Sequence, residues 1–323
     1  MSETNNNPRR SVLIVHGSDF KPPHDVFLDD ASAAIRHGLA RDYPDIPGVF
    51  EKLTIELAYY GDLGNELLRA QGKNYDEKLD IGDRRSALER LKKIRSRKRF
   101  SLQQYDKLRG KSAIPEAIAD VASPVLGALG MTPLLVSLVA RDFAVYLNGD
   151  PDFTAEVRAR LRNKLCAIMD RGDEILLMPH GTGCVVAYDV LWQLSHDERF
   201  EKYRDSKINL FVTLGSPLSD NKLRKRLLGA KNPPASRYPK NIITWHNVSA
   251  EDDYACHDKT VADDFSMMMR EHVISSINDF RIYNHTMRYG KSNPHCSLGY
   301  FVHPRIAKII VDWTGDQPVP AVE

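Results

Sequence analysis

The sequence has little charge imbalance, no paired cysteines and no long apolar run near its N-terminus. Its 323 residues carry a formal net charge of +2, which argues against a general binder of nucleic acid or other polyanions. The four cysteines are scattered and lack paired spacing, so we expect a reduced, cytoplasmic protein rather than a disulfide scaffold. The apolar run 12–15 is too short for the core of a signal peptide.

Motifs for metals, phosphates and repeats are also missing. No spacing of histidines and carboxylates resembles a zinc site, and no glycine-rich loop resembles a phosphate cradle. We therefore expect no metal and no cofactor. No internal repeat or low-complexity tract is present, and the apolar and charged fractions are typical of a soluble globular protein. The length suits one large domain or two small ones.

Short apolar runs alternate with amphipathic helical patterns along most of the chain. The runs that predict buried strands are 11–16, 53–60, 175–178, 208–214 and 241–248, the last clear one. The patterns that predict helices are 26–41, 152–170, 185–192 and 306–313. This alternation favours the α/β class, with a mostly parallel sheet flanked by helices.

Residues 62–149 interrupt this alternation. The basic run 83–99 predicts a helix whose charged face is solvated, with a site for anionic lipid headgroups or another polyanion as the alternative. The uncharged run 121–140 contains two prolines and two glycines, which favour two short helices over one membrane span. We interpret 62–149 as an inserted helical cap, with ordinary core or an interfacial membrane segment as alternatives for the apolar run.

The turn after residues 175–178 has an unusual composition. It reads Pro179-His180-Gly181-Thr182-Gly183, and a helical pattern follows it. Strand, sharp turn and helix together form the layout of a nucleophile elbow, in which a strained turn lifts one side chain above the sheet. The residue in register with that nucleophile is Gly181, which has no side chain. Ser216 is the rival nucleophile, but no elbow-like helix pattern follows it.

Reactive groups gather at four predicted strand ends, where open α/β sheets place their sites. These places are His16-Gly17-Ser18, the turn at Gly181, Glu251-Asp252-Asp253 and Asn293-Pro294-His295. A histidine that removes a proton from a nucleophile needs a carboxylate to hold its tautomer and stabilise its cation. The chain presents nucleophile position, acid and histidine in the order that α/β hydrolases use.

On these segments the chain resembles the serine esterase and lipase branch of the α/β hydrolases. The resemblance covers most of the chain outside residues 62–149. It rests on five segments in the family's order: V-L-I-V-H-G, P-H-G-T-G-C-V-V-A-Y-D, T-L-G-S-P-L, W-H-N-V-S-A-E-D-D-Y, and H-C-S-L-G-Y-F followed by I-A-K-I-I. It implies one α/β-hydrolase domain over residues 1–323, with the cap inserted at 62–149.

The resemblance also implies roles for single residues. His295 would be the general base and Asp253 its orienting acid, in competition with Asp252 and Asp258. The oxyanion hole would lie at Gly17, Ser18 and Thr182, formed by the amides of Ser18 and Thr182. The remaining candidates, His16 and His180, would contact the substrate.

The missing side chain at Gly181 leaves two explanations open. Without a hydroxyl there is no acyl-enzyme route, so Gly181 is either an introduced replacement of serine or part of a natural pseudoenzyme that binds an acyl ligand or a protein partner. The intact acid, histidine and oxyanion segments favour the first explanation. The sequence therefore predicts a carboxylic ester hydrolase, inactive as written, whose substrate is a small-molecule or lipid ester. Contact of the basic run or the apolar run with a membrane surface stays open.

Overall fold

The computed structural model of the chain describes residues 8–108, 140–253, 255–256 and 260–316. Six strands form one parallel sheet in the order β2-β1-β3-β4-β5-β6, and β7 and β8 form a small antiparallel pair. The strands are β1 Arg10–Val15, β2 Leu53–Ala58, β3 Glu174–Pro179, β4 Ile208–Leu214, β5 Ile242–Ala250, β6 Ser276–Ile282, β7 Met287–Arg288 and β8 Lys291–Ser292. The prediction of an α/β class with a mainly parallel sheet is confirmed.

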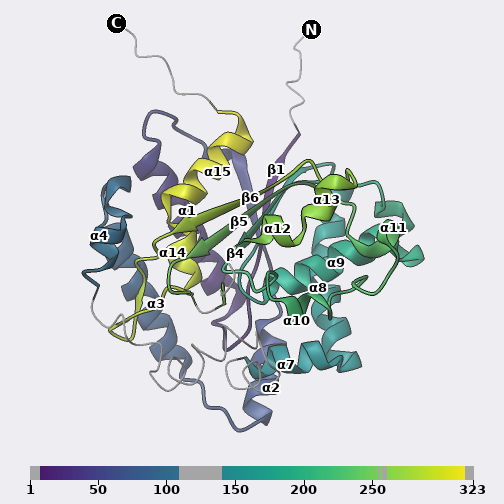
Figure 1. The fold of residues 1–323 in the computed structure, drawn as a ribbon. Helices are drawn as coiled ribbons and strands as arrows, with labels where there is room; N and C mark the ends of the chain where they lie inside the picture. Colours follow the sequence, from purple (N-terminus) through teal and green to yellow (C-terminus); the bar gives the residue numbers. More distant parts are fainter. Residues whose placement is uncertain (1–7, 109–139, 254, 257–259, 317–323) are drawn as a thin grey trace, which may run out of the picture.

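Helices cover both faces of this sheet (Figure 1). The longer helices are α1 His24–Asp42, α2 Gly61–Ala70, α3 Glu77–Lys92, α7 Arg141–Asn148, α8 Pro151–Asp170, α9 Gly183–His196 and α15 Pro304–Thr314. The shorter ones are α4 Leu102–Tyr105, α10 Asn221–Arg224, α11 Pro234–Arg237, α12 Val261–Asp264, α13 Ser266–Arg270 and α14 Ser297–Phe301. Within the described ranges, 3-10 turns occur at Phe50–Lys52, Arg97–Arg99 and Glu198–Tyr203.

The central strands are rich in buried apolar residues because both of their faces are covered. In β1, Val12 and Ile14 pack toward α1, α3, α14 and α15, whereas Leu13 and Val15 pack toward α8 and α9. Alternate residues thus enter two separate cores, one on each side of the sheet. The molecule therefore has three layers, with the sheet between two layers of helices.

The sequence prediction missed the last strand of the sheet. Residues 241–248 were expected to be the last clear strand, but β6 follows and pairs in parallel with β5. This edge strand has one neighbour, and its residues Asn278 and Arg281 are exposed. Its polar composition hides it from a search for buried apolar runs, since a solvated edge strand needs fewer apolar side chains.

The order of the strands creates a crevice at one edge of the sheet. The chain runs from β1 to β2 on one side and then returns to place β3 on the other side of β1. In open α/β sheets, such a reversal opens a site outside the carboxyl ends of the two strands. The amide of His180, after β3, donates to the carbonyl oxygen of Val15, at the end of β1, over 2.9 Å. The loop after β1 therefore lies beside the turn at Gly181.

The structure describes residues 62–108 and 140–149 of the proposed cap. Within them, α3 buries Ala87, Leu88 and Leu91 in the same core as Val12 and Ile14, so this helix belongs to a layer that covers the sheet. The apolar run lies outside the described residues except for Ala140, and the cap stays a prediction. None of the helices in the described ranges combines the length and apolar character that a membrane span requires.

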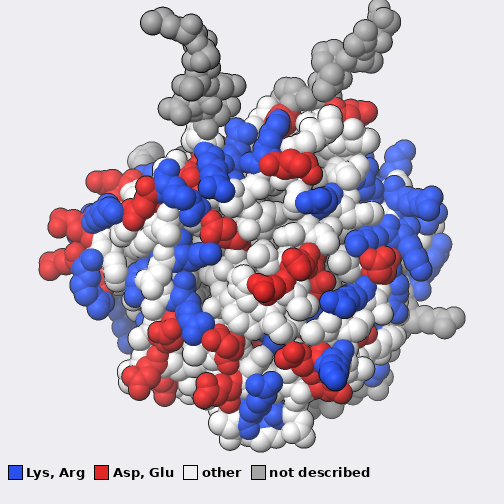
Figure 2. All heavy atoms as spheres, turned by 180° about the vertical axis from the view of Figure 1, so that it is seen from behind, with Lys and Arg blue, Asp and Glu red and all other residues white. Residues whose placement is uncertain are grey.

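Most of the basic run faces solvent. Figure 2 shows Lys and Arg gathered along its right-hand edge. This edge corresponds to the left-hand side of Figure 1, where α3 and α4 lie, because the two views differ by a half-turn. The exposed cations of the run are Arg85, Arg90, Lys93, Arg95, Arg97, Lys98 and Arg99. Arg84 is different, because it is buried against Asp80. The prediction of one helix over 83–99 is wrong in its extent, because α3 ends at Lys92 and of these exposed cations only Arg85 and Arg90 lie on it. The run is solvated as expected, except that α3 turns Arg84 inward.

Candidate active site

A histidine and a carboxylate meet at the carboxyl edge of the sheet. The ring Nδ1 of His295 lies 2.9 and 3.0 Å from the two oxygens of Asp253, whose side chain is fully buried. Burial by itself would raise the pKa of Asp253, but the charge and hydrogen bond of His295 lower that pKa below its usual value. A carboxylate that stays ionised can hold the Nδ1–H tautomer of His295, which directs Nε2 away from Asp253.

A third side chain fixes the carboxylate. The hydroxyl of Tyr300, in α14, donates to Asp253 Oδ2 over 2.6 Å and accepts from the amide of Ala250 over 2.9 Å. It thereby joins α14 to the end of β5, where the acid loop begins. The amide of Ala255 donates to the other oxygen of Asp253 over 2.9 Å. The sequence prediction missed Tyr300, because nothing in the order of residues 297–301 distinguishes a buried tyrosine from a core aromatic.

The two competing carboxylates are placed differently. Asp252 has a left-handed backbone with φ of 58° and accepts a hydrogen bond from the Tyr105 hydroxyl over 3.2 Å. Asp258 lies outside the described residues. Of the acid loop, the structure brings Asp253 to His295 and directs Asp252 toward α4.

Gly181 lies opposite the Nε2 side of the His295 ring. Its backbone is left-handed, with φ of 57°, and its amide donates to the carbonyl oxygen of Leu214 over 2.8 Å. A Cβ atom built on Gly181 would lie 3.0 Å from His295 Nε2. Such a backbone costs a residue with a side chain about 1–2 kcal/mol. The turn therefore has the left-handed shape of a nucleophile elbow, which would strain a residue with a side chain, and a side chain at 181 would point at His295.

The close approach around this turn requires glycine at two further positions. A Cβ atom at Gly183, the first residue of α9, would lie 2.4 Å from the carbonyl oxygen of His16. One at Gly17 would lie 3.1 Å from the carbonyl oxygen of His180. Because real side chains do not fit at 2.4 Å, Gly183 is what allows α9 to begin against the end of β1.

The predicted oxyanion hole is occupied by a side chain of the protein. The amide of Ser18 donates to the hydroxyl oxygen of Thr182 over 2.8 Å, and the Ser18 hydroxyl contacts the same oxygen. The amide of Ser18 thus becomes a donor to a ligand only when the Thr182 side chain turns away. The amide of Thr182 lies beside Gly17, 3.4 Å from where a Cβ of that glycine would stand. The two amides predicted for the oxyanion hole are therefore close to each other. The amide of Ser18 already donates to the Thr182 hydroxyl.

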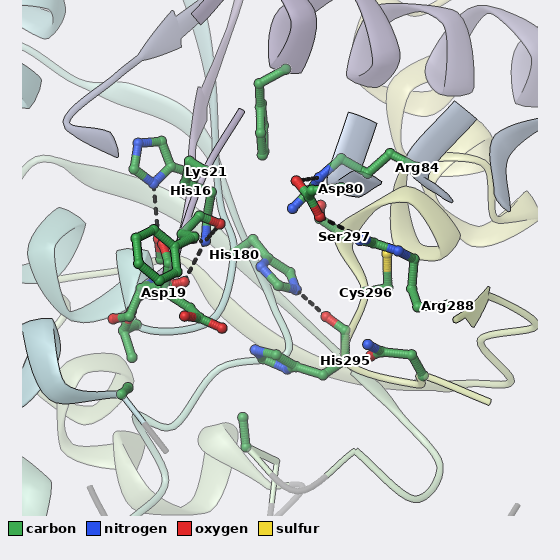
Figure 3. A pocket seen from close by; sticks show the side chains of 18 of the residues that line it. His16, Asp19, Lys21, Asp80, Arg84, His180, Arg288, His295, Cys296 and Ser297 are labelled. Atoms are coloured by element: carbon green, nitrogen blue, oxygen red, sulfur yellow. Dashed lines mark hydrogen bonds and ion pairs between the residues drawn. The ribbon is translucent and has the colours of Figure 1, made fainter. Parts of the chain in front are cut away.

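The two other predicted histidines hold the loops together. His16 accepts from the amide of Tyr60 at Nε2 over 3.0 Å and donates through Nδ1 to the Gly17 carbonyl over 2.8 Å. Burial, and then the charge of Lys21, lowers the pKa of His16 to about 3, so its ring is neutral. His180 donates through Nε2 to the carbonyl oxygen of His295 over 2.8 Å (Figure 3). Their contact with a substrate stays a prediction, since both rings already serve the scaffold.

The loop after β1 is pinned by a buried ammonium group that the sequence prediction missed. Lys21 Nζ donates to the carbonyl oxygens of Ser18, Asp19 and Phe20, the last two over 3.0 and 3.4 Å. Burial lowers the pKa of Lys21 to about 8, although Asp19 opposes this shift. The ammonium group gathers the three carbonyls on one side of the loop. It therefore helps to set the position of the Ser18 amide beside Thr182.

A cavity of about 390 Å³ opens above His180, Thr182 and His295. Its size is in the range of small-molecule sites. Figure 3 shows Lys21 and Asp19 on one side of it, Arg84 and Arg288 on the other, and the two histidines between them. Among residues 8–108, 140–253, 255–256 and 260–316, no group of three or more His, Cys, Asp and Glu side chains could hold a metal ion.

The arrangement can carry out proton transfer at position 181 if that residue supplies a hydroxyl. As the chain stands, a histidine paired with a carboxylate and two backbone amides surround a glycine. No family model, no curated protein and no solved structure matches the chain.

Proposed function

We propose that the chain has an α/β-hydrolase fold and that this site is built for hydrolysis of carboxylic esters, with residue 181 as the nucleophile position. One observation supports this above all others. The Cβ position of Gly181, the two ring nitrogens of His295 and the carboxylate of Asp253 follow one another at 3.0 and 2.9 Å. Nucleophile, base and acid have this sequence of contacts in every hydrolase that uses a serine triad.

With a serine at 181, the residues would act in a defined order. His295 Nε2 would take the hydroxyl proton while the oxygen attacks the ester carbonyl, and Asp253 would stabilise the resulting imidazolium. The Thr182 amide would donate to the oxyanion, and the alcohol would leave with the proton from His295. Water would then release the acyl group by the same steps. As written, the chain can bind an ester at this site but cannot form the acyl-enzyme.

A non-catalytic binding protein is the second candidate. Two observations favour it: Gly181 adopts its left-handed backbone without cost, and the Thr182 hydroxyl already occupies the amide of Ser18. In that case the cavity would hold an acyl compound without converting it. The two candidates differ in whether restoring a hydroxyl at 181 creates a reactive group.

Labelling with a fluorophosphonate probe separates these two candidates. We expect the Gly181→Ser chain to be labelled at residue 181, because such probes react with a serine whose hydroxyl is activated by a neighbouring base. Peptide mass spectrometry identifies the labelled residue. The Gly181→Ala chain, which adds the Cβ without the hydroxyl, should remain unlabelled. A folded Gly181→Ser chain that takes up no probe would favour the binding protein.

A further inference from the structure

The wall of the cavity on the side of α3 carries a cluster of charged groups that the proposed chemistry does not use. Arg84 and Asp80 come from α3, and Arg288 comes from β7. All three side chains are buried and line the cavity, where they lie close together in Figure 3. Burying three charged groups is costly unless each is paired, so their hydrogen bonds must be counted.

The carboxylate of Asp80 uses all of its acceptor sites. Asp80 Oδ2 accepts from Arg84 Nε over 2.7 Å and from the Tyr75 hydroxyl over 2.9 Å. Asp80 Oδ1 accepts from Arg288 Nη2 over 2.5 Å and from the Tyr289 hydroxyl over 3.3 Å. Asp83 accepts from Arg288 Nε and from the amide of Tyr289. Two carboxylates thus serve six donors.

The guanidinium of Arg84 has N–H groups that donate to no acceptor within the described residues. Within the described part of the chain it donates through Nε alone, to Asp80, and its two terminal nitrogens have no protein acceptor. Its side chain is 11% exposed, and it lines the cavity. These nitrogens are not sealed off from solvent, and because Arg84 lines the cavity, a ligand that enters it can supply their acceptors.

We propose that Arg84 binds an oxyanionic group of the substrate, a carboxylate or a phosphate, so that the natural ester carries a second, negatively charged end. A guanidinium presents parallel N–H groups that match two oxygens of such a group. Asp80 and Asp83 offset the charges of Arg84 and Arg288, so recognition rests on donor geometry more than on net charge. This inference rests on the proposed function for the ester, but the anion site itself requires no nucleophile.

The test measures ligand binding to the unaltered chain by titration calorimetry. The probes are monomethyl glutarate, dimethyl glutarate and inorganic phosphate, which separate a carboxylate end, a neutral end and a phosphate group. We expect monomethyl glutarate or phosphate to bind at least tenfold more tightly than dimethyl glutarate. The tighter of the two anions identifies the group that the site prefers. Equal binding of monomethyl and dimethyl glutarate, with no binding of phosphate, would overturn the inference.

The variants assign the effect to one residue. Arg84→Met should abolish the preference for the anion, and Arg84→Lys should retain part of it, because lysine keeps the charge but loses the paired donors. Arg85→Met is the matched control, since Arg85 is the next residue of α3 and is exposed. If Arg84→Met does not fold, Arg84→Lys carries the test. An anion preference that is unchanged in the folded Arg84 variants would contradict the assignment.

Failure of this inference is distinguishable from failure of the proposed function. A Gly181→Ser chain that hydrolyses neutral and anionic esters equally well would remove the anion site and leave the hydrolase. A parent chain that prefers the anion, together with a Gly181→Ser chain that hydrolyses neither ester, would keep the anion site and remove the hydrolase.

Discussion

Replacing Gly181 by serine is expected to raise the turnover of a chromogenic ester by about a million-fold over the parent chain, since that is roughly the loss when such a nucleophile is removed. The hydroxyl would attach to a Cβ that stands 3.0 Å from His295 Nε2. At that distance the His295 ring must move by a few tenths of an ångström to give normal contact. The measurement is the release of nitrophenolate from 4-nitrophenyl acetate and longer esters, followed at constant pH.

The Gly181→Ala chain controls for the added side chain. It introduces the same Cβ and the same strain of about 1–2 kcal/mol but no hydroxyl, so its turnover should equal that of the parent. A Gly181→Ser chain that folds and shows no turnover at any acyl length would contradict the proposed function. Equal rates in the serine and alanine chains would show that the reaction does not involve residue 181.

The second large effect is expected at the acid. In the Gly181→Ser chain, a further Asp253→Asn replacement should reduce turnover by about ten thousand-fold, because the amide stabilises the wrong tautomer of the histidine and no imidazolium. Asp253 makes contacts of 2.9 and 3.0 Å to His295 Nδ1, so the replacement changes this interaction directly. The measurement is kcat and KM for the same ester, with the loss expected in kcat.

Asp252→Asn is the matched control for this loss. Asp252 is the adjacent carboxylate, but its oxygen accepts from Tyr105 and does not contact His295 among the described residues. We expect turnover within a few-fold of the Gly181→Ser chain. Losses of equal size at Asp252 and Asp253 would indicate that the acid loop acts through its structure alone. A loss at Asp252 with none at Asp253 would show that the orienting carboxylate was misidentified.

The sheet was predictable from the sequence wherever strands are buried on both faces. Residues 11–16 and 208–214 are uninterrupted or nearly uninterrupted apolar runs, and they correspond to β1 and β4. The edge strand β6 escaped because Asn278 and Arg281 point to solvent and break the pattern. The order of the strands was not predictable. It depends on the side of the sheet to which each helical crossover connection leads, and no short sequence pattern encodes that choice.

Some residues of the site were also predictable from the sequence, and others were not. Gly181, Asp253 and His295 could be selected because each follows a predicted strand or precedes a predicted helix, and the structure brings them together. Lys21 and Tyr300 could not be selected. Their roles depend on backbone groups that come near only in the folded chain, such as the carbonyls of residues 18–20 and the amide of Ala250.

The burial of Arg84 could not be predicted from the charge pattern of the basic run. Arg84 lies among nine Lys and Arg residues between 83 and 99, most of which are exposed. Its sequence neighbours give no sign that it turns inward, because the inward face of α3 is set by packing against α1. Asp80 lies one turn earlier on the same face, and this spacing of four residues is the one hint that the sequence offers.

The most direct test of the central claim is the initial burst of nitrophenolate when the Gly181→Ser chain is mixed with excess 4-nitrophenyl ester in a stopped-flow instrument. A covalent mechanism predicts a burst of about one nitrophenolate per chain, because the activated ester acylates residue 181 faster than water removes the acyl group. An acid-quenched sample should show the mass of one acyl group on that residue. The burst should disappear when His295→Ala is added. Steady release with no burst and no acyl adduct would contradict the claim that residue 181 is the nucleophile position of an ester hydrolase.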